Sequence, residues 1–143
     1  MENQTIAHGT CLCGAVSISA TDMSKSLCAC HCTMCIKWGG GPWLAVECVD
    51  VTFTGQEHIK IYDSSAWAER GFCQRCGNHL FYRIKRNNLY YISIGLFDEC
   101  ENVKFDLQMF IDQKPEYYCF ANETEELTAA EVYEKYAAPP TSS

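Results

Sequence analysis

The chain has 143 residues, enough for one domain with a proper hydrophobic core. Its net charge of −7 argues against nucleic acid as the main partner, because such a partner requires a basic surface. No stretch approaches the ~20 apolar residues of a membrane span, and the opening MENQTIAHGT lacks the basic and apolar regions of a signal peptide. We therefore expect a cytoplasmic protein with no membrane partner.

Short β-strands are predicted for most of the chain, because short runs rich in Val, Ile, Thr, Phe and Tyr recur along it. The predicted strands cover residues 13–20, 43–55, 79–84, 89–97, 104–112 and 116–121. The sequence KRNN at 85–88 predicts a hairpin turn, and Lys114–Pro115 predicts a second turn.

One helix is predicted near the C-terminus, over residues 128–138. Thr128 with Glu131 three residues later is the capping-box pattern, and Pro139 and Pro140 end the helix. The predicted fold class is therefore mainly β, in short antiparallel sheets with a minor C-terminal helix. We expect residues 1–143 to form a single domain, with a core over about 9–120.

Eleven cysteines are the exceptional feature of the composition. An odd number cannot pair completely within one chain, and in a reducing cytosol clustered cysteines usually bind metal or take part in catalysis. Three clusters stand out, CLC at 11–13, CACHCTMC at 28–35 and CQRC at 73–76. The cysteines outside them are expected to be buried as small hydrophobic residues: Cys48, Cys100 and Cys119.

The first and third clusters suit a closed metal site. A C-x-x-C turn places two sulfurs on one side of a tight knuckle, and Gly77 can take the positive φ that such a turn often requires. Two cysteine pairs from distant parts of a chain can close a tetrahedral zinc site, here Cys11 and Cys13 with Cys73 and Cys76. The free energy of metal binding would then contribute to the free energy of folding. A redox dithiol is less favoured, because a βαβ pattern is missing.

The middle cluster combines C-x-C and C-x-x-C spacing at Cys30, Cys32 and Cys35. Three protein ligands with an open fourth position are typical of catalytic zinc. In an extended chain Cys28 would lie about 13 Å from Cys32, whereas two sulfurs on one zinc lie at most ~4.6 Å apart. We expect Cys28 to be a buried thiol, or a resting thiol near the open position, and not a ligand. His31 would point to the opposite face, where it packs or forms hydrogen bonds.

The motifs GTCLCGAV, CHCTMC, GGGPW, GFCQRCG and ISIGLFD occur in the order seen in the glutathione-dependent formaldehyde-activating enzyme family, which the chain resembles from Gly9 to about Tyr118. That family has an Mss4-like zinc-binding β fold and joins formaldehyde to glutathione. The resemblance implies two zinc ions per chain. It assigns a structural zinc to Cys11, Cys13, Cys73 and Cys76, and a catalytic zinc to Cys30, Cys32 and Cys35.

Four features depart from the family pattern but leave these cysteines intact. Asn78 stands where Thr or Ser usually follows CxxCG, and Gln108 stands where a His is common. Tyr117 and Tyr118 occupy the region of a frequent Trp, and Ile36 replaces a basic residue after the third cysteine.

The three-cysteine site predicts thiol chemistry. A metal-bound thiol is deprotonated, and its thiolate is a nucleophile at neutral pH. We therefore expect addition of a thiol such as glutathione to formaldehyde or a related small electrophile, the reaction of an S-(hydroxymethyl)glutathione synthase-like carbon–sulfur lyase. Lys37 is the candidate cation for a glutathione carboxylate, and Trp43 or Trp38 the candidate wall of the pocket. Arg70 and Arg75 are expected to be solvated.

Two other functions are compatible with the same cysteines. The chain could be a zinc-stabilised binding module with no chemistry. It could also be a thiol enzyme with a different substrate, since methionine sulfoxide reductases share a similar zinc-pinned fold and a fold alone does not select a function.

Overall fold

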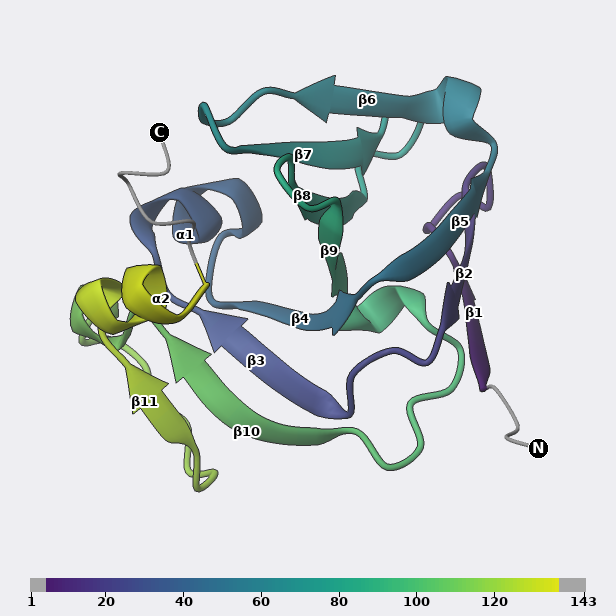
Figure 1. The fold of residues 1–143 in the computed structure, drawn as a ribbon. Coiled ribbons are helices and arrows are strands. Elements are labelled where there is room, and N and C mark those ends of the chain that lie inside the picture. The colour runs from purple at the N-terminus through teal and green to yellow at the C-terminus, as the bar shows by residue number, and fades with distance from the viewer. Residues whose placement is uncertain (1–4, 137–143) are drawn as a thin grey trace. The chain divides into compact units, whose positions relative to one another are not determined.

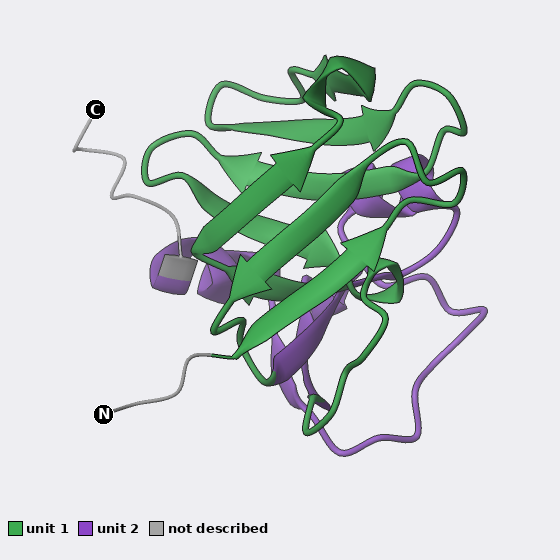
Figure 2. Cartoon of the chain, turned by 90° about the vertical axis from the view of Figure 1, so that its right-hand side faces the viewer, with its two compact units in different colours: residues 1–25, 45–103 green, residues 26–44, 104–143 purple. Residues whose placement is uncertain are grey.

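A computed structural model describes residues 5–136 (Figure 1). The chain divides into two compact units, each built from two separate segments (Figure 2). Unit 1 comprises residues 1–25 and 45–103, and unit 2 comprises residues 26–44 and 104–143. Strands dominate the described residues and helices are few, so the predicted mainly β class is confirmed.

Unit 1 contains two antiparallel sheets. The smaller has the strand order β1-β2-β5, and the larger runs β4-β9-β8-β7-β6 within this unit. Its elements are β1 (Ile6–Thr10), β2 (Ser17–Thr21), β4 (Trp43–Cys48, in unit 1 from Ala45), β5 (Asp50–Thr54), η1 (Gln56–His58), β6 (Ile59–Tyr62), β7 (Ala68–Cys73), β8 (His79–Ile84), β9 (Leu89–Ser93) and η2 (Ile94–Leu96).

The predicted hairpin around KRNN is confirmed, because β8 pairs with β9 antiparallel and Ile84 faces Leu89. Asn88 adopts a φ of 58° in this turn, a left-handed conformation that asparagine tolerates. The predicted strand 43–55 is instead two strands, β4 and β5, that separate at the exposed Val49.

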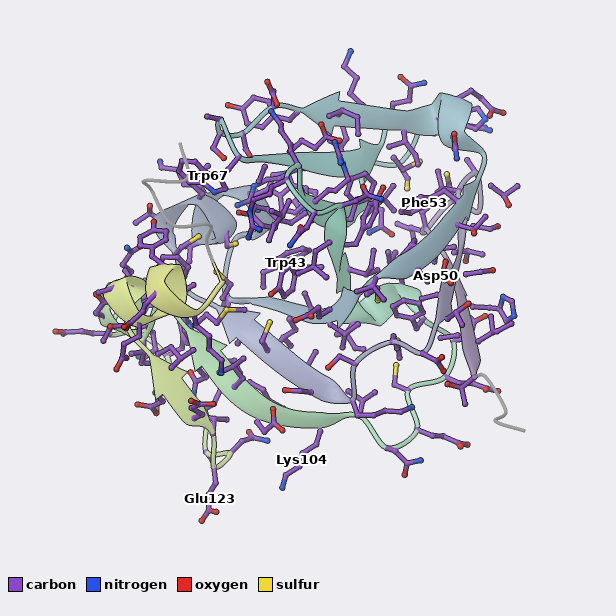
Figure 3. All side chains as sticks on the ribbon, viewed as in Figure 1. Trp43, Asp50, Phe53, Trp67, Lys104 and Glu123 are labelled. Carbon is purple, nitrogen blue, oxygen red and sulfur yellow. The ribbon has the colours of Figure 1, made fainter. Side chains whose placement is uncertain are left out.

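Close approach at two glycines sets the packing of unit 1. A Cβ on Gly9 would lie 2.1 Å from the carbonyl oxygen of Leu96, and a Cβ on Gly71 would lie 2.3 Å from the Phe81 ring. The Phe81 ring in turn lies 5.2 Å from the ring of Phe53, which is labelled in Figure 3. These contacts fix the positions of β1 and β7. Strand β1 leads into the first cysteine pair, and β7 ends at Cys73.

Arg70 is buried, which corrects the sequence-based expectation that its charge is solvated. Only 3% of the residue is exposed, and its guanidinium carbon lies 4.9 Å from the centroid of the Tyr82 ring. An arginine can be buried in this way because its planar guanidinium stacks on aromatic faces. Arg75 is exposed, as expected.

Unit 2 contains a parallel ladder of strand order β11-β10-β3, visible in Figure 1. Its elements are β3 (Ser26–Cys30), α1 (Thr33–Gly39), β10 (Lys104–Met109), η3 (Ile111–Gln113), β11 (Glu125–Leu127) and α2 (Ala129–Tyr136). Antiparallel strands were expected from the sequence, whereas β10 pairs parallel with both neighbours. A parallel pair requires a long connection, and local turn signals cannot reveal partners as distant as β3 and β10.

Two local predictions in unit 2 differ from the structure. Residues 116–121 form no strand, because this segment packs Tyr118 and Phe120 against His31 instead of joining a ladder. Helix α1 was not predicted. Its N-cap is Cys32, and cysteine is not among the residues that usually signal a helix start.

The predicted capping box of the C-terminal helix is confirmed. The Thr128 N–H donates to Glu131 Oε1 at 2.8 Å, and the Glu131 N–H donates to Thr128 Oγ1 at 3.3 Å. The predicted end of the helix at 137–138 and the two following prolines lie outside the described residues. No helix within residues 5–136 has the length and apolar character needed to cross a membrane.

Candidate metal centres

Four cysteines from two distant segments meet in unit 1. Cys11 and Cys13 follow β1, Cys73 ends β7, and Cys76 lies in the turn before β8. Their four sulfur atoms all lie within 4.8 Å of one another. Gly77 has a φ of 80°, the positive value expected of a C-x-x-C knuckle.

The sulfur separations fit a metal ion. Cys13 Sγ lies 3.7 Å from the sulfurs of both Cys11 and Cys73. A disulfide bond would require about 2.05 Å, and all eleven cysteines are free thiols. Tetrahedral ligation with Zn–S bonds of ~2.3 Å places two sulfurs about 3.8 Å apart. This group can therefore hold a metal ion with four cysteine ligands.

The thiols of this group differ in pKa. Burial raises the pKa of Cys11, but the N–H of Val16, which donates to its sulfur at 3.4 Å, and the neighbouring thiols together lower that pKa to about 6. For Cys13 the N–H of Ala15 lowers the pKa, but burial and the thiols of Cys11 and Cys73 raise it to about 11. Adjacent thiolates repel one another, so full ionisation of the group requires a cation.

Asn78, a departure from the family pattern, connects the two halves of this group. Its Oδ1 accepts from the Leu12 N–H at 2.9 Å, and its Nδ2 donates to the His79 carbonyl at 3.0 Å. Its own carbonyl accepts from the Cys73 N–H at 2.9 Å. Sequence reasoning assigned Asn78 no role, yet its side chain ties the Cys11–Cys13 loop to the second knuckle.

The second group, in unit 2, has three members. Cys30 ends β3, Cys32 is the N-cap of α1, and Cys35 lies in the first turn of that helix. Their sulfurs also lie within 4.8 Å of one another. Strand β3 ends at Cys30 and α1 begins at Thr33, and this change of structure brings together sulfurs that a continuous strand would separate. Cys32 Sγ accepts the Cys35 N–H at 3.3 Å.

The thiols of this group interact strongly. Hydrogen bonds from the Cys30 thiol to the sulfurs of Cys32 and Cys35, reinforced by burial and by the charges of those two residues, raise the pKa of Cys30 well above its usual value. Three thiolates therefore cannot form together unless a cation compensates their charge. The donor set suits a soft or borderline metal ion such as zinc.

Cys28 lies on β3, is 4% exposed and does not belong to the group of three. It faces Leu107 in the parallel ladder. That it binds no metal stays a prediction.

His31 lies between Cys30 and Cys32 in the sequence, and it is fully buried. Its Nδ1 lies 2.7 Å from Tyr118 Oη, and its Nε2 lies 2.7 Å from Gln108 Oε1. The expectation that His31 packs and forms hydrogen bonds is confirmed. Sequence analysis noted Gln108 and Tyr118 as departures from the family pattern but did not foresee that both contact one imidazole.

The two predicted substrate-binding residues lie near the three-cysteine group in the sequence. Lys37 is exposed in the last turn of α1. Trp43, labelled in Figure 3, is half-buried, and its ring lies edge-on 5.6 Å from that of Trp38. Their roles in substrate binding stay predictions.

A cavity of about 440 Å³ in unit 1 contains no cysteine of either group. It is lined by residues of β1, by Met23 and Lys25, and by the segment that begins at Asp98. Asp98 is exposed there, and its N–H donates to the His8 carbonyl at 2.9 Å. Because the predicted chemistry requires thiols, its candidate site is the three-cysteine group and not this cavity.

The remaining cysteines differ from one another. Cys48 is 1% exposed, and burial, with the charge of Glu47, raises its pKa to about 12. Cys100 and Cys119 are exposed, which corrects the expectation that they are buried. Both lie outside regular strands, where no sheet face covers them.

Comparison with known proteins agrees with this arrangement. The family described as glutathione-dependent formaldehyde-activating enzyme matches residues 6–113, which include every cysteine of the two groups. The chain belongs to this family. A Schizosaccharomyces pombe protein named as an uncharacterized lyase is 39% identical over 127 residues, which cover 87% of this chain and 93% of the yeast protein.

A solved structure shares the fold. The crystal structure of a Rhodobacter sphaeroides protein superposes with a TM-score of 0.55 at 24% identity, and the match covers 64% of this chain and 87% of that one. At this identity the likeness concerns the fold alone.

Proposed function

We propose that the chain is a zinc-dependent carbon–sulfur lyase that joins a thiol, glutathione in the first place, to formaldehyde or a related small electrophile. The observation that carries the proposal is the three-cysteine group, because within residues 5–136 it gathers three thiols where the other group gathers four. Three protein ligands are typical of catalytic zinc and four of structural zinc. Family membership and the name of the yeast relative support a lyase of this kind.

The residues have separate roles in this proposal. Cys11, Cys13, Cys73 and Cys76 would hold a structural zinc ion, and Cys30, Cys32 and Cys35 would hold a second. A zinc ion held there would coordinate the sulfur of an incoming thiol and so lower its pKa. The buried His31 fixes the backbone between Cys30 and Cys32. Lys37 and Trp43 would contact the substrate.

The proposed reaction balances without an oxidant or reductant. One carbon–sulfur bond forms, and the carbonyl double bond becomes a single C–O bond. The proton that leaves the thiol ends on the aldehyde oxygen. Catalysis therefore requires a thiolate at neutral pH and a proton donor for the oxygen.

The test is the exchange of formaldehyde with glutathione at equilibrium, followed by exchange NMR. Zinc-loaded protein is expected to raise the exchange rate without shifting the equilibrium. Because uncatalysed addition is fast, the matched control is the Cys35→Ser variant at the same concentration. Equal rates with both proteins would refute the enzymatic proposal and favour a zinc-stabilised binding module. Exchange with other small electrophiles would then distinguish a thiol enzyme of different specificity.

A further inference from the structure

The ammonium group of Lys114 is held in place in the loop that follows η3. Its Nζ donates to the carbonyl of Pro115 at 2.8 Å and to the carbonyl of Tyr118, and it lies 5.0 Å from the centroid of the Tyr118 ring. The residue is half-buried. A lysine ammonium has three N–H donors, so one donor remains for another acceptor.

The charge of Lys114 has no counter-ion in the described part of the chain. Lys114 takes part in none of the ion pairs His58–Glu57, Arg83–Glu69 and Lys85–Asp63. Carbonyl oxygens orient the ammonium but do not neutralise it. A partly buried charge without an opposite charge is costly, and that cost is offset when an anionic ligand binds.

Tyr118 connects this ammonium to the three-cysteine group. Its carbonyl accepts from Lys114, and its hydroxyl oxygen lies 2.7 Å from His31 Nδ1. His31 stands between Cys30 and Cys32 in the sequence. Tyr118 therefore links the ammonium of Lys114 to the residue that separates two of the three cysteines.

Lys37 offers a different environment. It is exposed on α1, and it forms no hydrogen bond or ion pair with another residue of the described range 5–136. A lysine held by carbonyls has less side-chain entropy to lose on binding than a freely moving one.

We infer that Lys114 receives a carboxylate of the thiol substrate whose sulfur reacts at Cys30, Cys32 and Cys35. This inference rests on the proposed function and adds to it a residue that would select a thiol with a carboxylate over a neutral alkyl thiol. One ammonium binds one carboxylate of glutathione, and the exposed Lys37 is suited to the other.

The test compares two ligands that have no thiol, S-methylglutathione and its dimethyl ester, whose carboxylates are blocked. Binding to the zinc-loaded protein is measured by calorimetry or by NMR titration. The wild type should bind the acid more tightly than the ester. A charge-assisted hydrogen bond contributes enough that Lys114→Met should weaken binding of the acid about tenfold and leave binding of the ester unchanged. Lys114→Arg, which keeps the charge, should recover part of the affinity.

The control is Lys104→Met, because Lys104 is exposed at the start of β10 in the same unit and is labelled in Figure 3. It should leave both affinities unchanged. Equal loss for the acid and the ester in Lys114→Met would show a structural role for the loop and overturn the inference. An unchanged affinity for the acid would overturn it as well.

A separate assay keeps this outcome distinct from the proposed function. Exchange of formaldehyde with glutathione is compared in the wild type and in Cys35→Ser. If the two proteins exchange it equally fast, the catalytic proposal fails, whereas the binding comparison still decides whether Lys114 holds a carboxylate.

Discussion

Nδ1 of His31 accepts a hydrogen bond from the hydroxyl group of Tyr118, and the nitrogen and oxygen atoms lie 2.7 Å apart. The direction follows from the other side of the ring, where Nε2 faces the amide oxygen of Gln108 at 2.7 Å. An amide oxygen only accepts, so Nε2 carries the proton of the neutral imidazole. The side-chain amide nitrogen of Gln108 donates to Thr124 Oγ1 at 2.9 Å, and this bond fixes the orientation of the Gln108 amide. Three side chains thus determine the tautomer of one buried ring.

Tyr118→Phe should therefore destabilise the protein. The change leaves Nδ1 of the fully buried His31 without a donor, and an unsatisfied buried acceptor costs about 1–3 kcal/mol. The free energy of unfolding from urea titration is the measurement. Tyr117→Phe is the matched control, because Tyr117 is 76% exposed and surface changes usually stay within about 0.5 kcal/mol. Similar losses in the two variants would contradict this hydrogen-bond network.

His31→Ala should weaken metal binding at the three-cysteine group. The ring anchors the backbone between Cys30 and Cys32, and loss of a residue that orients metal ligands typically lowers metal affinity about 10–100-fold. Competition with a chelator should show one weakened zinc per chain and one unchanged zinc. His8→Ala, at an exposed histidine of unit 1, should leave both unchanged. Weakening of both zinc ions in His31→Ala would indicate general unfolding instead.

Loss of the four-cysteine centre should reduce stability, whereas loss of the three-cysteine centre should remove activity. Cys76→Ser should unfold the protein or sharply lower its melting temperature, because the four-cysteine group joins segments as distant as Cys13 and Cys73. Cys35→Ser should remain folded, with less zinc and no activity. Metal analysis and thermal melts on both variants decide this. The assignment of roles is wrong if Cys35→Ser unfolds as readily as Cys76→Ser.

Cys28→Ala should keep the zinc stoichiometry of the wild type. Cys28 is buried on β3 and lies outside the group formed by Cys30, Cys32 and Cys35. The expected effect is a modest loss of packing. Loss of one zinc per chain would reveal a closed four-cysteine site and remove the open position that the proposed chemistry needs.

Alkylation should separate the cysteines that bind no metal. In zinc-loaded protein at pH 8, iodoacetamide should modify the exposed Cys100 and Cys119 and spare Cys48. The thiolate is the reactive form, and a folded-state pKa of about 12 keeps Cys48 protonated until the pH approaches that value. Mass spectrometry of tryptic peptides identifies the modified sites. Early labelling of Cys48 would show that its strand opens readily.

The cysteine spacing predicted which thiols meet, because C-x-C and C-x-x-C patterns constrain sulfur positions locally. It did not predict α1, since the group that starts this helix is the sulfur of Cys32 and not a usual cap. The segment 116–121 has the composition of a strand, but Tyr118 bonds to a histidine far away in the sequence, and no local pattern reveals such a partner. Gln108 and Tyr118 were visible as unusual residues, yet only the fold shows that they contact the same ring.

The division of each unit into two segments determines when each metal centre can be completed during synthesis. The three-cysteine group lies within residues 30–35, so all its thiols exist once residue 35 has been made. The four-cysteine group must wait for Cys76, and β10, the partner of β3, begins only at Lys104. The growing chain therefore carries a complete set of three thiols before the strand that flanks them has left the ribosome. Residue order alone makes the three-cysteine group complete, and available to a metal ion or an oxidant, before the four-cysteine group.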